Sequence, residues 1–307
     1  MMIVKLRRYE RNPILKANPE RDWENQCAFN PGSVMHEGKV HILYRAAGVK
    51  PKVPGSRFYE ARIGLAVSEN GYDISYRHPE PVIDWDSDDE RRWGVFGVDG
   101  VEDPRVTKID DTYYIVYAVT SACWDRLALA STKDFKTFEK HGLLVGDIAQ
   151  RTGALFPERI NGKYFLMHRP IPNIWVSESR DMKDFSNSKM ILSNKVLPWC
   201  EMKLGVCAPP IKTRNSWAVI FHGRDRSNTY RLGIFWLDLN DPTKVLKVQE
   251  EPIMEPEAPY ELKDGITSNC IYACGTVEKD GTLFVYYGAC DKYTCVATMP
   301  VEDLVME

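Results

Sequence analysis

Charged and amide side chains stand in this sequence where runs of strand-forming apolar residues come to an end. Burying one of them without a partner would cost about 2–7 kcal/mol, so we expect them to meet one another or a ligand. They are Asn30, Arg45, Glu102, Asp103, Arg105, Arg151, Glu158, His168, Arg169, Lys203, His222 and Asp291.

Cations outnumber anions in this set. The cationic members are Arg105, Arg151, Arg169 and Lys203, with His222 as a fifth when protonated. The anions that could face them are Asp103 and Asp291, with Glu102 and Glu158. An arginine binds phosphate oxygens through two parallel hydrogen bonds, and a lysine adds a point charge. A site with this surplus should attract a small oxyanion, although no glycine-rich loop opening a helix is present to hold a nucleotide phosphate.

Each of these residues has an ordinary explanation when taken alone. Asp103, which precedes a proline, suits a turn that starts a strand, and Arg169, also before a proline, suits an exposed strand end. His222 could be a hydrogen-bonded core histidine, and Lys203 a solvated loop lysine. A shared site is favoured because all four occupy equivalent places in a repeated strand pattern.

That pattern opens on a turn residue, runs through β-branched and aromatic residues, and ends on small or polar groups. Its five copies are Gly38 to Gly48, Asp111 to Ser121, Asn161 to Pro170, Asn215 to Asp225 and Asp280 to Asp291. The strands expected after them are Arg62 to Ser68, Arg126 to Ser131, Asn173 to Ser179, Tyr230 to Asp238 and Tyr293 to Met299. The strands expected before them are Ala28 to Met35, Val101 to Lys108, Ala154 to Ile160, Val206 to Lys212 and Ser268 to Val277.

Self-similarity at a spacing of roughly 50–70 residues is typical of propeller blades. The sequence therefore predicts an all-β fold, a five-bladed β-propeller whose innermost strands aim their polar ends at one axial pocket. The repeat continues almost to Glu307, so we expect a single domain over residues 1–307. We predict about one helical turn in each of two segments, Phe135 to His141 and Pro300 to Met306. We predict surface loops at Ala46 to Glu60 and at Asp84 to Arg92.

Composition excludes several classes of protein. The net charge is −3, and no basic run is interleaved with aromatic residues, so the chain lacks the positive electrostatic field that nucleic-acid binding requires. No apolar stretch reaches the roughly 18 residues of a membrane span. The basic segment Met1 to Asn12 has no apolar region behind it, so we expect no secretory signal and a cytoplasmic protein.

The eight cysteines contain no C-x-x-C pair, and several stand in apolar strands. This favours buried, reduced thiols in a cytosolic protein, with a metal site or disulfides as the alternatives. We expect neither a bound metal nor an organic cofactor.

The ordered set of motifs resembles glycoside hydrolase family 130, the inverting mannoside phosphorylases with a five-bladed propeller. The stretches that carry the resemblance are FNPGSV (29–34), LYRA (43–46), GVEDPRV (100–106), TGALFPERINGKYFLMHRP (152–170), KLGVCAPPIKT (203–213), FHG (221–223), EPEAPYE (255–261) and YYGACD (286–291). The resemblance implies that Asp103 is the single catalytic acid. It implies phosphate binding by Arg151, Arg169, Lys203 and His222, and sugar binding by Asn30, Arg45, Arg105 and Asp291.

The implied reaction is phosphorolysis of β-1,2- or β-1,4-linked manno-oligosaccharides to α-mannose 1-phosphate, with inorganic phosphate as co-substrate. Phosphate already carries negative charge, so no protein base is needed, in contrast to a hydrolytic inverting enzyme. Family members are thought to pass the proton from the acid through the mannose 3-hydroxyl. We lean slightly to the β-1,2 linkage because the short chain leaves little room for acceptor loops.

Two alternatives stay open, a β-mannosidase of the same fold that uses water and a glycan-binding propeller without catalysis. Because oligomers are common in the family, the resemblance also admits a homo-oligomer, whose size no sequence feature fixes.

Overall fold

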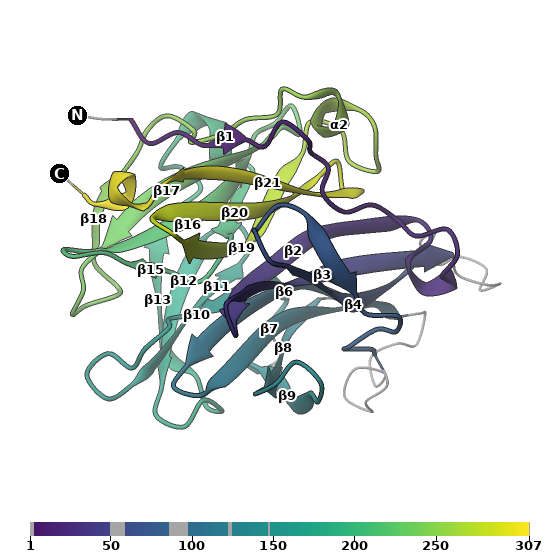
Figure 1. Ribbon diagram of the computed structural model, residues 1–307. Helices are drawn as coiled ribbons and strands as arrows, with labels where there is room; N and C mark the ends of the chain where they lie inside the picture. The colour runs from purple at the N-terminus through teal and green to yellow at the C-terminus, as the bar shows by residue number, and fades with distance from the viewer. Residues whose placement is uncertain (1–2, 50–58, 86–97, 122–124, 147, 307) are drawn as a thin grey trace.

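The computed structural model describes residues 3–49, 59–85, 98–121, 125–146 and 148–306, which form an all-β fold (Figure 1). Much of the predicted loops Ala46 to Glu60 and Asp84 to Arg92 lies outside these residues. Helix is confined, in the described ranges, to single turns: η1 (Asp22–Glu24), η2 (Pro198–Cys200), α2 (Pro259–Leu262) and η3 (Val301–Leu304). No helix in this part of the chain is both long and apolar enough to cross a membrane.

Most described strands fall into antiparallel units, each a run of neighbours in sequence. Unit one holds β2 (Cys27–His36), β3 (Lys39–Val49), β4 (Tyr59–Ser68) and β5 (Ile74–Arg77). Unit two holds β6 (Val98–Ile109), β7 (Thr112–Ser121), β8 (Arg126–Thr132) and β9 (Glu139–Leu144). Unit three holds β10 (Gln150–Leu155), β11 (Tyr164–Pro170), β12 (Ile174–Ser179) and β13 (Ser186–Leu192). A parallel pairing of Ala61 with Gly100 joins units one and two into one sheet.

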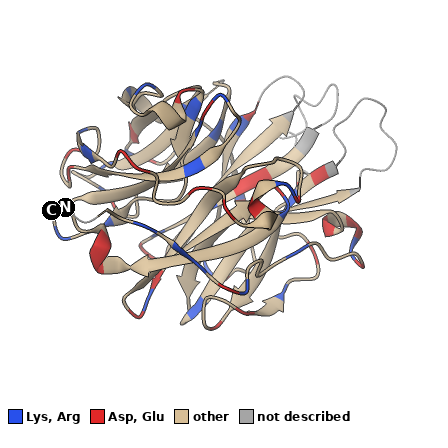
Figure 2. Cartoon of the chain, turned by 90° about the horizontal axis from the view of Figure 1, so that it is seen from above, with Lys and Arg blue, Asp and Glu red and all other residues tan. Residues whose placement is uncertain are grey.

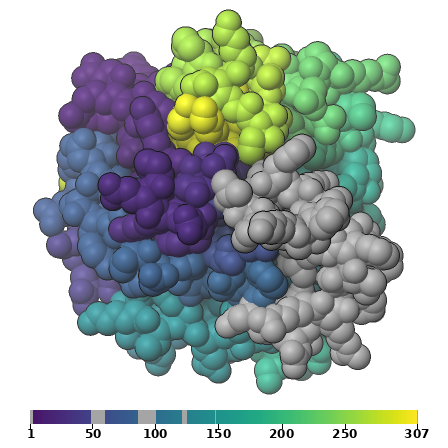
Figure 3. Space-filling model, turned by 90° about the vertical axis from the view of Figure 1, so that its right-hand side faces the viewer, coloured from purple at the N-terminus to yellow at the C-terminus, as the bar shows by residue number. Residues whose placement is uncertain are grey.

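Unit four holds β14 (Lys203–Val206), β15 (Ile211–Lys212), β16 (Trp217–Arg224), β17 (Tyr230–Leu237) and β18 (Val245–Val248). Unit five holds β19 (Ile271–Lys279), β20 (Thr282–Ala289) and β21 (Tyr293–Pro300), and its fourth strand is β1 (Arg7–Arg8) from the other end of the chain. Figure 3 shows residues from the two ends of the chain side by side on one face. The N-terminal segment thus completes the C-terminal sheet.

The strands form where the sequence places β-branched and aromatic residues, and tight turns join them. In units one, three and five the first two strands meet through Glu37-Gly38, Asn161-Gly162 and Asp280-Gly281, whose six φ angles are all positive. Two successive positive φ angles are the signature of a type I′ hairpin turn, which matches the twist of the flanking strands.

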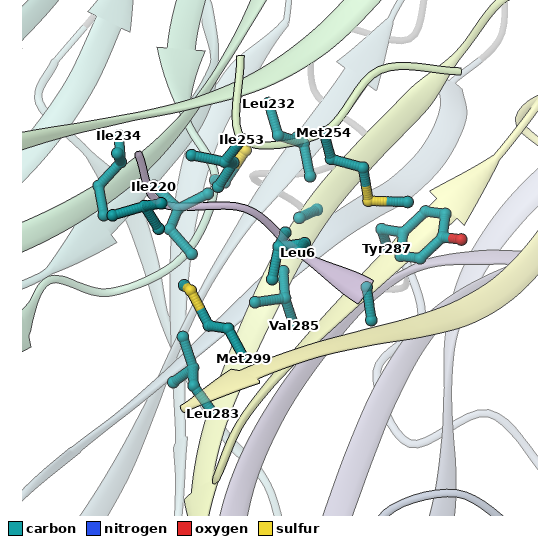
Figure 4. Close-up of a cluster of buried hydrophobic side chains, with 14 of the residues drawn as sticks. Leu6, Ile220, Leu232, Ile234, Ile253, Met254, Leu283, Val285, Tyr287 and Met299 are labelled. Carbon is teal, nitrogen blue, oxygen red and sulfur yellow. The ribbon is translucent and has the colours of Figure 1, made fainter. Parts of the chain in front are cut away.

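Apolar side chains fill the space between neighbouring units. In one cluster, Leu6 of the N-terminal segment lies among Ile220, Ile234 and Val285 from units four and five (Figure 4). Full burial of one such side chain contributes about 1.5–3 kcal/mol. Figure 2 shows the complementary pattern, with charged residues mainly on loops and strand ends.

The first strands of four units carry an irregularity. The register shifts between Phe29 and Gly32 in β2, and between Glu102 and Arg105 in β6. Shifts also occur between Gln150 and Gly153 in β10, and between Ala273 and Gly275 in β19. A β-bulge re-aims side chains and breaks the simple alternation of strand faces. Three of these bulges hold a residue of the predicted site, namely Asn30, Asp103 and Arg151, and the fourth, in β19, holds none.

Three predicted elements are wrong in detail. Phe135 to His141 is not helical, because Glu139–Leu144 pairs with β8 as strand β9. The strand predicted at Ala154 to Ile160 begins earlier, at Gln150. The strand predicted at Val206 to Lys212 is split into β14 and β15, because the two prolines at 209 and 210 offer no N–H to the ladder.

Candidate active site

One polar cavity collects residues from units one to five. Its volume is about 420 Å³ when the space at its open mouth is counted. The residues that line it are Asn30, Arg45, Asp103, Arg151, Arg169, Lys203, Tyr230, Cys270, Tyr272 and Asp291. Seven of the nine residues predicted to form the site are therefore at the cavity, and Arg105 and His222 lie behind it.

Asp103 and Asn30 face each other across the first two units. The Asn30 side-chain amide donates a 2.8 Å hydrogen bond to Oδ1 of Asp103, and both residues are buried. Both sit at β-bulges with positive φ angles of 47° for Asn30 and 53° for Asp103. Asn and Asp tolerate this left-handed conformation better than other side chains do. The backbone irregularity thus brings a carboxyl and its amide partner into the cavity.

Glu102, next to Asp103, is buried and does not line the cavity. It accepts hydrogen bonds from Arg45 and from Arg151 on different oxygens. Arg45 also lies 3.5 Å from Oδ1 of Asp103, and Arg151 lies 3.3 Å from a carboxylate oxygen of Asp125. Both arginines are therefore largely neutralised by protein carboxylates.

Arg169 is 2% exposed, and no described carboxylate lies within ion-pair distance of it. Its Nη1 donates to Nε2 of His222 over 3.3 Å, while its Nε has no partner among the described residues. His222 contacts the Cys207 sulfur at 3.7 Å through Nδ1. Burial and the nearby cations hold the pKa of His222 well below its usual range. A neutral His222 accepting from Arg169 fixes the guanidinium and leaves other N–H groups for a ligand.

Gly205 leaves the room for this pair. A Cβ at Gly205 would lie 2.8 Å from Cε1 of His222 and 3.0 Å from Cδ of Arg169. We therefore place His222 behind Arg169, as a support for it, and not on the cavity wall where a phosphate ligand was predicted.

Lys203 opens β14 opposite Arg224 of β16, and its Nζ lies 5.3 Å from the centre of the Tyr230 ring. Burial, followed by the charges of Arg169, Arg224 and Arg151, lowers the pKa of Lys203 to about 7. Among the described residues, no carboxylate pairs with this ammonium. Lys203 and Arg169 thus form a positive corner that an anion would stabilise.

Asp291 brings a second carboxyl to the cavity from the end of β20. It accepts a hydrogen bond from the Thr267 hydroxyl, and its φ of 52° again belongs to the left-handed region. Desolvation raises its pKa above the ordinary value. Gly288 allows the close approach of unit five, since a Cβ there would lie 2.1 Å from Oδ1 of Asn30.

The predicted sugar contact through Arg105 is not supported by the geometry. Its guanidinium is fully buried and donates to the carbonyls of Asp103 and Cys207 and to the Tyr272 hydroxyl, at 2.7, 2.9 and 3.1 Å. Arg105 therefore ties the backbone of Asp103 to units four and five.

Two further polar residues do not join the site. The side chain of Glu158 is 45% exposed and pairs with Lys212, so it is not a central anion. His168 is a hydrogen-bonded core histidine between Gln150 and Ser177, and burial lowers its pKa to about 4.

Sequence reasoning missed Tyr230, Tyr272 and Cys270, which line the cavity. Aromatic and thiol groups in a strand are usually core, so their types carried no signal for a site. The one usable sign was the position of Tyr230, at the start of a strand that follows a repeat copy. In the described ranges, no group of histidine, cysteine and acidic residues could hold a metal ion.

Comparisons with known proteins agree over nearly the whole chain. The sequence model of glycoside hydrolase family 130, described as beta-1,4-mannooligosaccharide phosphorylase, matches residues 5–307. The chain is 37% identical over 305 residues to a 1,2-beta-oligomannan phosphorylase of Thermoanaerobacter sp. strain X514, with 98% of this chain and 99% of the relative covered. It is 38% identical over 310 residues to a beta-1,2-mannobiose phosphorylase of the same strain, with 98% and 99% covered.

A solved structure gives the same result. Beta-1,2-mannobiose phosphorylase from Listeria innocua, in complex with beta-1,2-mannobiose, superposes with a TM-score of 0.86 at 27% identity, over 97% of this chain and 98% of that one. This agreement, together with the match of the family over residues 5–307, shows that the chain belongs to glycoside hydrolase family 130.

Proposed function

We propose that this protein is an inverting β-mannoside phosphorylase that transfers the terminal mannose of short β-1,2-linked manno-oligosaccharides to inorganic phosphate. The observation that carries the proposal is one cavity that holds Asp103 beside a positive corner of Arg169 and Lys203. Two relatives at 37% and 38% identity, both named for phosphorolysis of β-1,2-mannosides, support the linkage.

We further propose that the five strand units are the blades of one propeller domain over residues 1–307. The strand β1, which completes the sheet of β19 to β21, supports this proposal because it ties the two ends of the chain together. We propose the cytosol as its compartment, since seven described cysteines are buried free thiols, as expected under reducing conditions.

Asp103 would act as the general acid. Its carboxyl is held by Asn30 and approached by Arg45, which fixes it in the cavity. Removing the proton donor from glycoside cleavage typically costs about 10²–10⁴ in rate. In this mechanism Arg45, Asn30 and Asp291 hold the mannose ring so that the acid can protonate the departing oxygen through a sugar hydroxyl.

Phosphate would bind at Arg169 and Lys203, with Arg151 at the side of the site. The unpartnered Nε of Arg169 supports this, because a buried donor without a partner is costly and an anion oxygen would satisfy it. Fixed cations would offset the repulsion between phosphate and the carboxylates and align phosphate for attack on C1. Since phosphate brings its own charge, Asp291 need not serve as a base.

The linkage is tested by comparing β-1,2-mannobiose, β-1,2-mannotriose and β-1,4-mannobiose in the presence of phosphate. We expect the kcat/KM for both β-1,2 substrates to exceed that for the β-1,4 substrate by about 100-fold or more, a difference of roughly 2.7 kcal/mol in transition-state binding. Turnover of β-1,4-mannobiose alone would overturn the β-1,2 assignment and leave phosphorolysis standing.

Anion binding should weaken as the pH rises above neutrality. Because burial and the neighbouring arginines disfavour charge on Lys203, its ammonium loses the proton as the pH passes about 7, whereas a bound anion favours the charged form. Sulfate keeps its charge in this range, so any change of its inhibition constant with pH comes from groups of the protein and not from the ligand. We expect that constant to be lowest below pH 7 and to rise by up to about tenfold per pH unit above it.

Lys203→Met is the matched variant for this titration. It should bind sulfate weakly, with an inhibition constant that does not vary between pH 6 and 9. A constant equally flat in the wild-type enzyme would show that Lys203 does not titrate with anion binding.

A further inference from the structure

Glu102 is a buried carboxylate for which the reaction described above has no role. Its side chain is 1% exposed, and it lies one residue before Asp103 at the β6 bulge. Asp103 lines the cavity and Glu102 does not. Burying an ionised carboxylate is costly unless strong partners compensate, so its partners indicate what it does.

Its two arginine partners come from the units on either side, and a hydroxyl partner comes from its own unit. Oε1 accepts from Nη2 of Arg45, on β3 of unit one, and from the Thr120 hydroxyl at 3.3 Å. Oε2 accepts from Nη2 of Arg151, on β10 of unit three. Both arginines line the cavity, so one carboxylate of unit two holds cavity arginines of the units on either side.

The two arginines reach the cavity from different units, Arg45 from β3 and Arg151 from β10. Arg45 lies 3.5 Å from Asp103, on the side where the sugar would bind. Arg151 follows Gln150, which pairs with Pro170 next to Arg169, so it enters the cavity from the same sheet edge as that member of the positive corner. Without the charge of Glu102 the cavity becomes more positive near that corner even though Arg151 keeps its contact with Asp125, and Arg45 loses the contact that orients it beside Asp103.

We propose that Glu102 is a positioning residue that fixes Arg45 and Arg151 and limits the positive charge offered to phosphate, thereby setting the relative affinity for mannoside and phosphate. This inference rests on the proposed phosphorolysis. It differs from a purely structural role, because it predicts opposite effects on the two substrates.

The test is the steady-state kinetics of Glu102→Gln with each substrate varied in turn. We expect the KM for phosphate to fall by about threefold or more, since the cavity gains one positive charge. We expect the KM for the mannoside to rise by about tenfold and kcat to fall by about tenfold, since Arg45 is no longer held beside Asp103. A substitution that only reduced the fraction of folded enzyme would lower the apparent kcat and leave both KM values unchanged.

Glu24→Gln is the matched control. Glu24 is also fully buried and also bridges two arginines and a hydroxyl, namely Arg21, Arg77 and Tyr44, but it does not line the cavity. We expect this variant to unfold at a lower temperature and to keep wild-type KM values for both substrates.

Glu102→Asp separates the effect of the negative charge from the effect of side-chain length. It keeps the negative charge, but its side chain is one methylene shorter and cannot span both arginines. We expect its mannoside KM to rise and its phosphate KM not to fall. If Glu102→Gln does not fold, a folded Glu102→Asp protein with a wild-type mannoside KM overturns the proposal.

Two results with Glu102→Gln would also overturn it: KM values that both match the wild type, or KM values that move in the same direction. A wild-type enzyme that does not use phosphate is a different failure, because it removes the proposed function itself.

Discussion

Asp103→Asn should abolish phosphorolysis while leaving the fold intact. The variant keeps the shape of the side chain and an oxygen that can accept the Asn30 hydrogen bond, and asparagine tolerates the φ of 53° at this position. It loses the acid proton and the negative charge that faces Arg45. We expect kcat to fall by about a thousandfold or more, within the usual contribution of a general acid, with the melting temperature close to that of the wild type.

Asp280→Asn is the control for this substitution. Asp280 has a φ of 51° in a hairpin turn, and its side chain is 89% exposed, so the same chemical change occurs in the same backbone conformation outside the cavity. Its kcat should match the wild type. Turnover by Asp103→Asn at a rate near that of Asp280→Asn would remove Asp103 from the mechanism.

Arg169→Ala and Lys203→Ala should each raise the KM for phosphate by about 10–100-fold. A hydrogen bond to a charged group contributes about 1.5–3 kcal/mol, which corresponds to this range. Arg169→Ala should have the larger effect, because it also leaves Nε2 of His222 without its donor. The KM for the mannoside should change much less, since no hydrogen bond joins either side chain to Asp103 or Asn30. Initial rates with phosphate varied at saturating mannoside measure the effect.

Lys212→Ala is the control for the charge. Lys212 also belongs to unit four, but its side chain is 50% exposed and pairs with Glu158 away from the cavity. We expect this variant to keep the wild-type phosphate KM. If Arg169→Ala and Lys203→Ala both behave like Lys212→Ala, the anion site lies elsewhere.

Much of the all-β fold could be predicted because strand periodicity and turn chemistry agree along the chain. The run Asp280 to Asp291 opens on an Asp-Gly turn and alternates little, as expected of a strand buried on both faces. The prediction failed where local pattern and tertiary pairing differ. Residues 150–153 hold few apolar side chains, yet Gln150 and Gly153 pair with Pro170 and His168 of β11, a tertiary pairing that the local pattern does not reveal.

The site was harder to predict residue by residue, and the β-bulges explain why. Side chains alternate between the two faces of a regular strand, but the bulge between Glu102 and Arg105 breaks that alternation. The sequence shows three charged residues in four positions and cannot tell which of them faces the cavity. In the structure only Asp103 of these three lines the cavity. Glu102 instead binds Arg45 and Arg151, and Arg105 donates to the carbonyl of Asp103.

The most direct test of the proposed phosphorolysis is the conversion of β-1,2-mannobiose with and without inorganic phosphate, followed by identification of the product anomer. We expect turnover that requires phosphate and yields mannose 1-phosphate in the α configuration, together with free mannose in equal amount. Release of mannose alone, at a rate that does not depend on phosphate, would contradict it and make the protein a β-mannosidase.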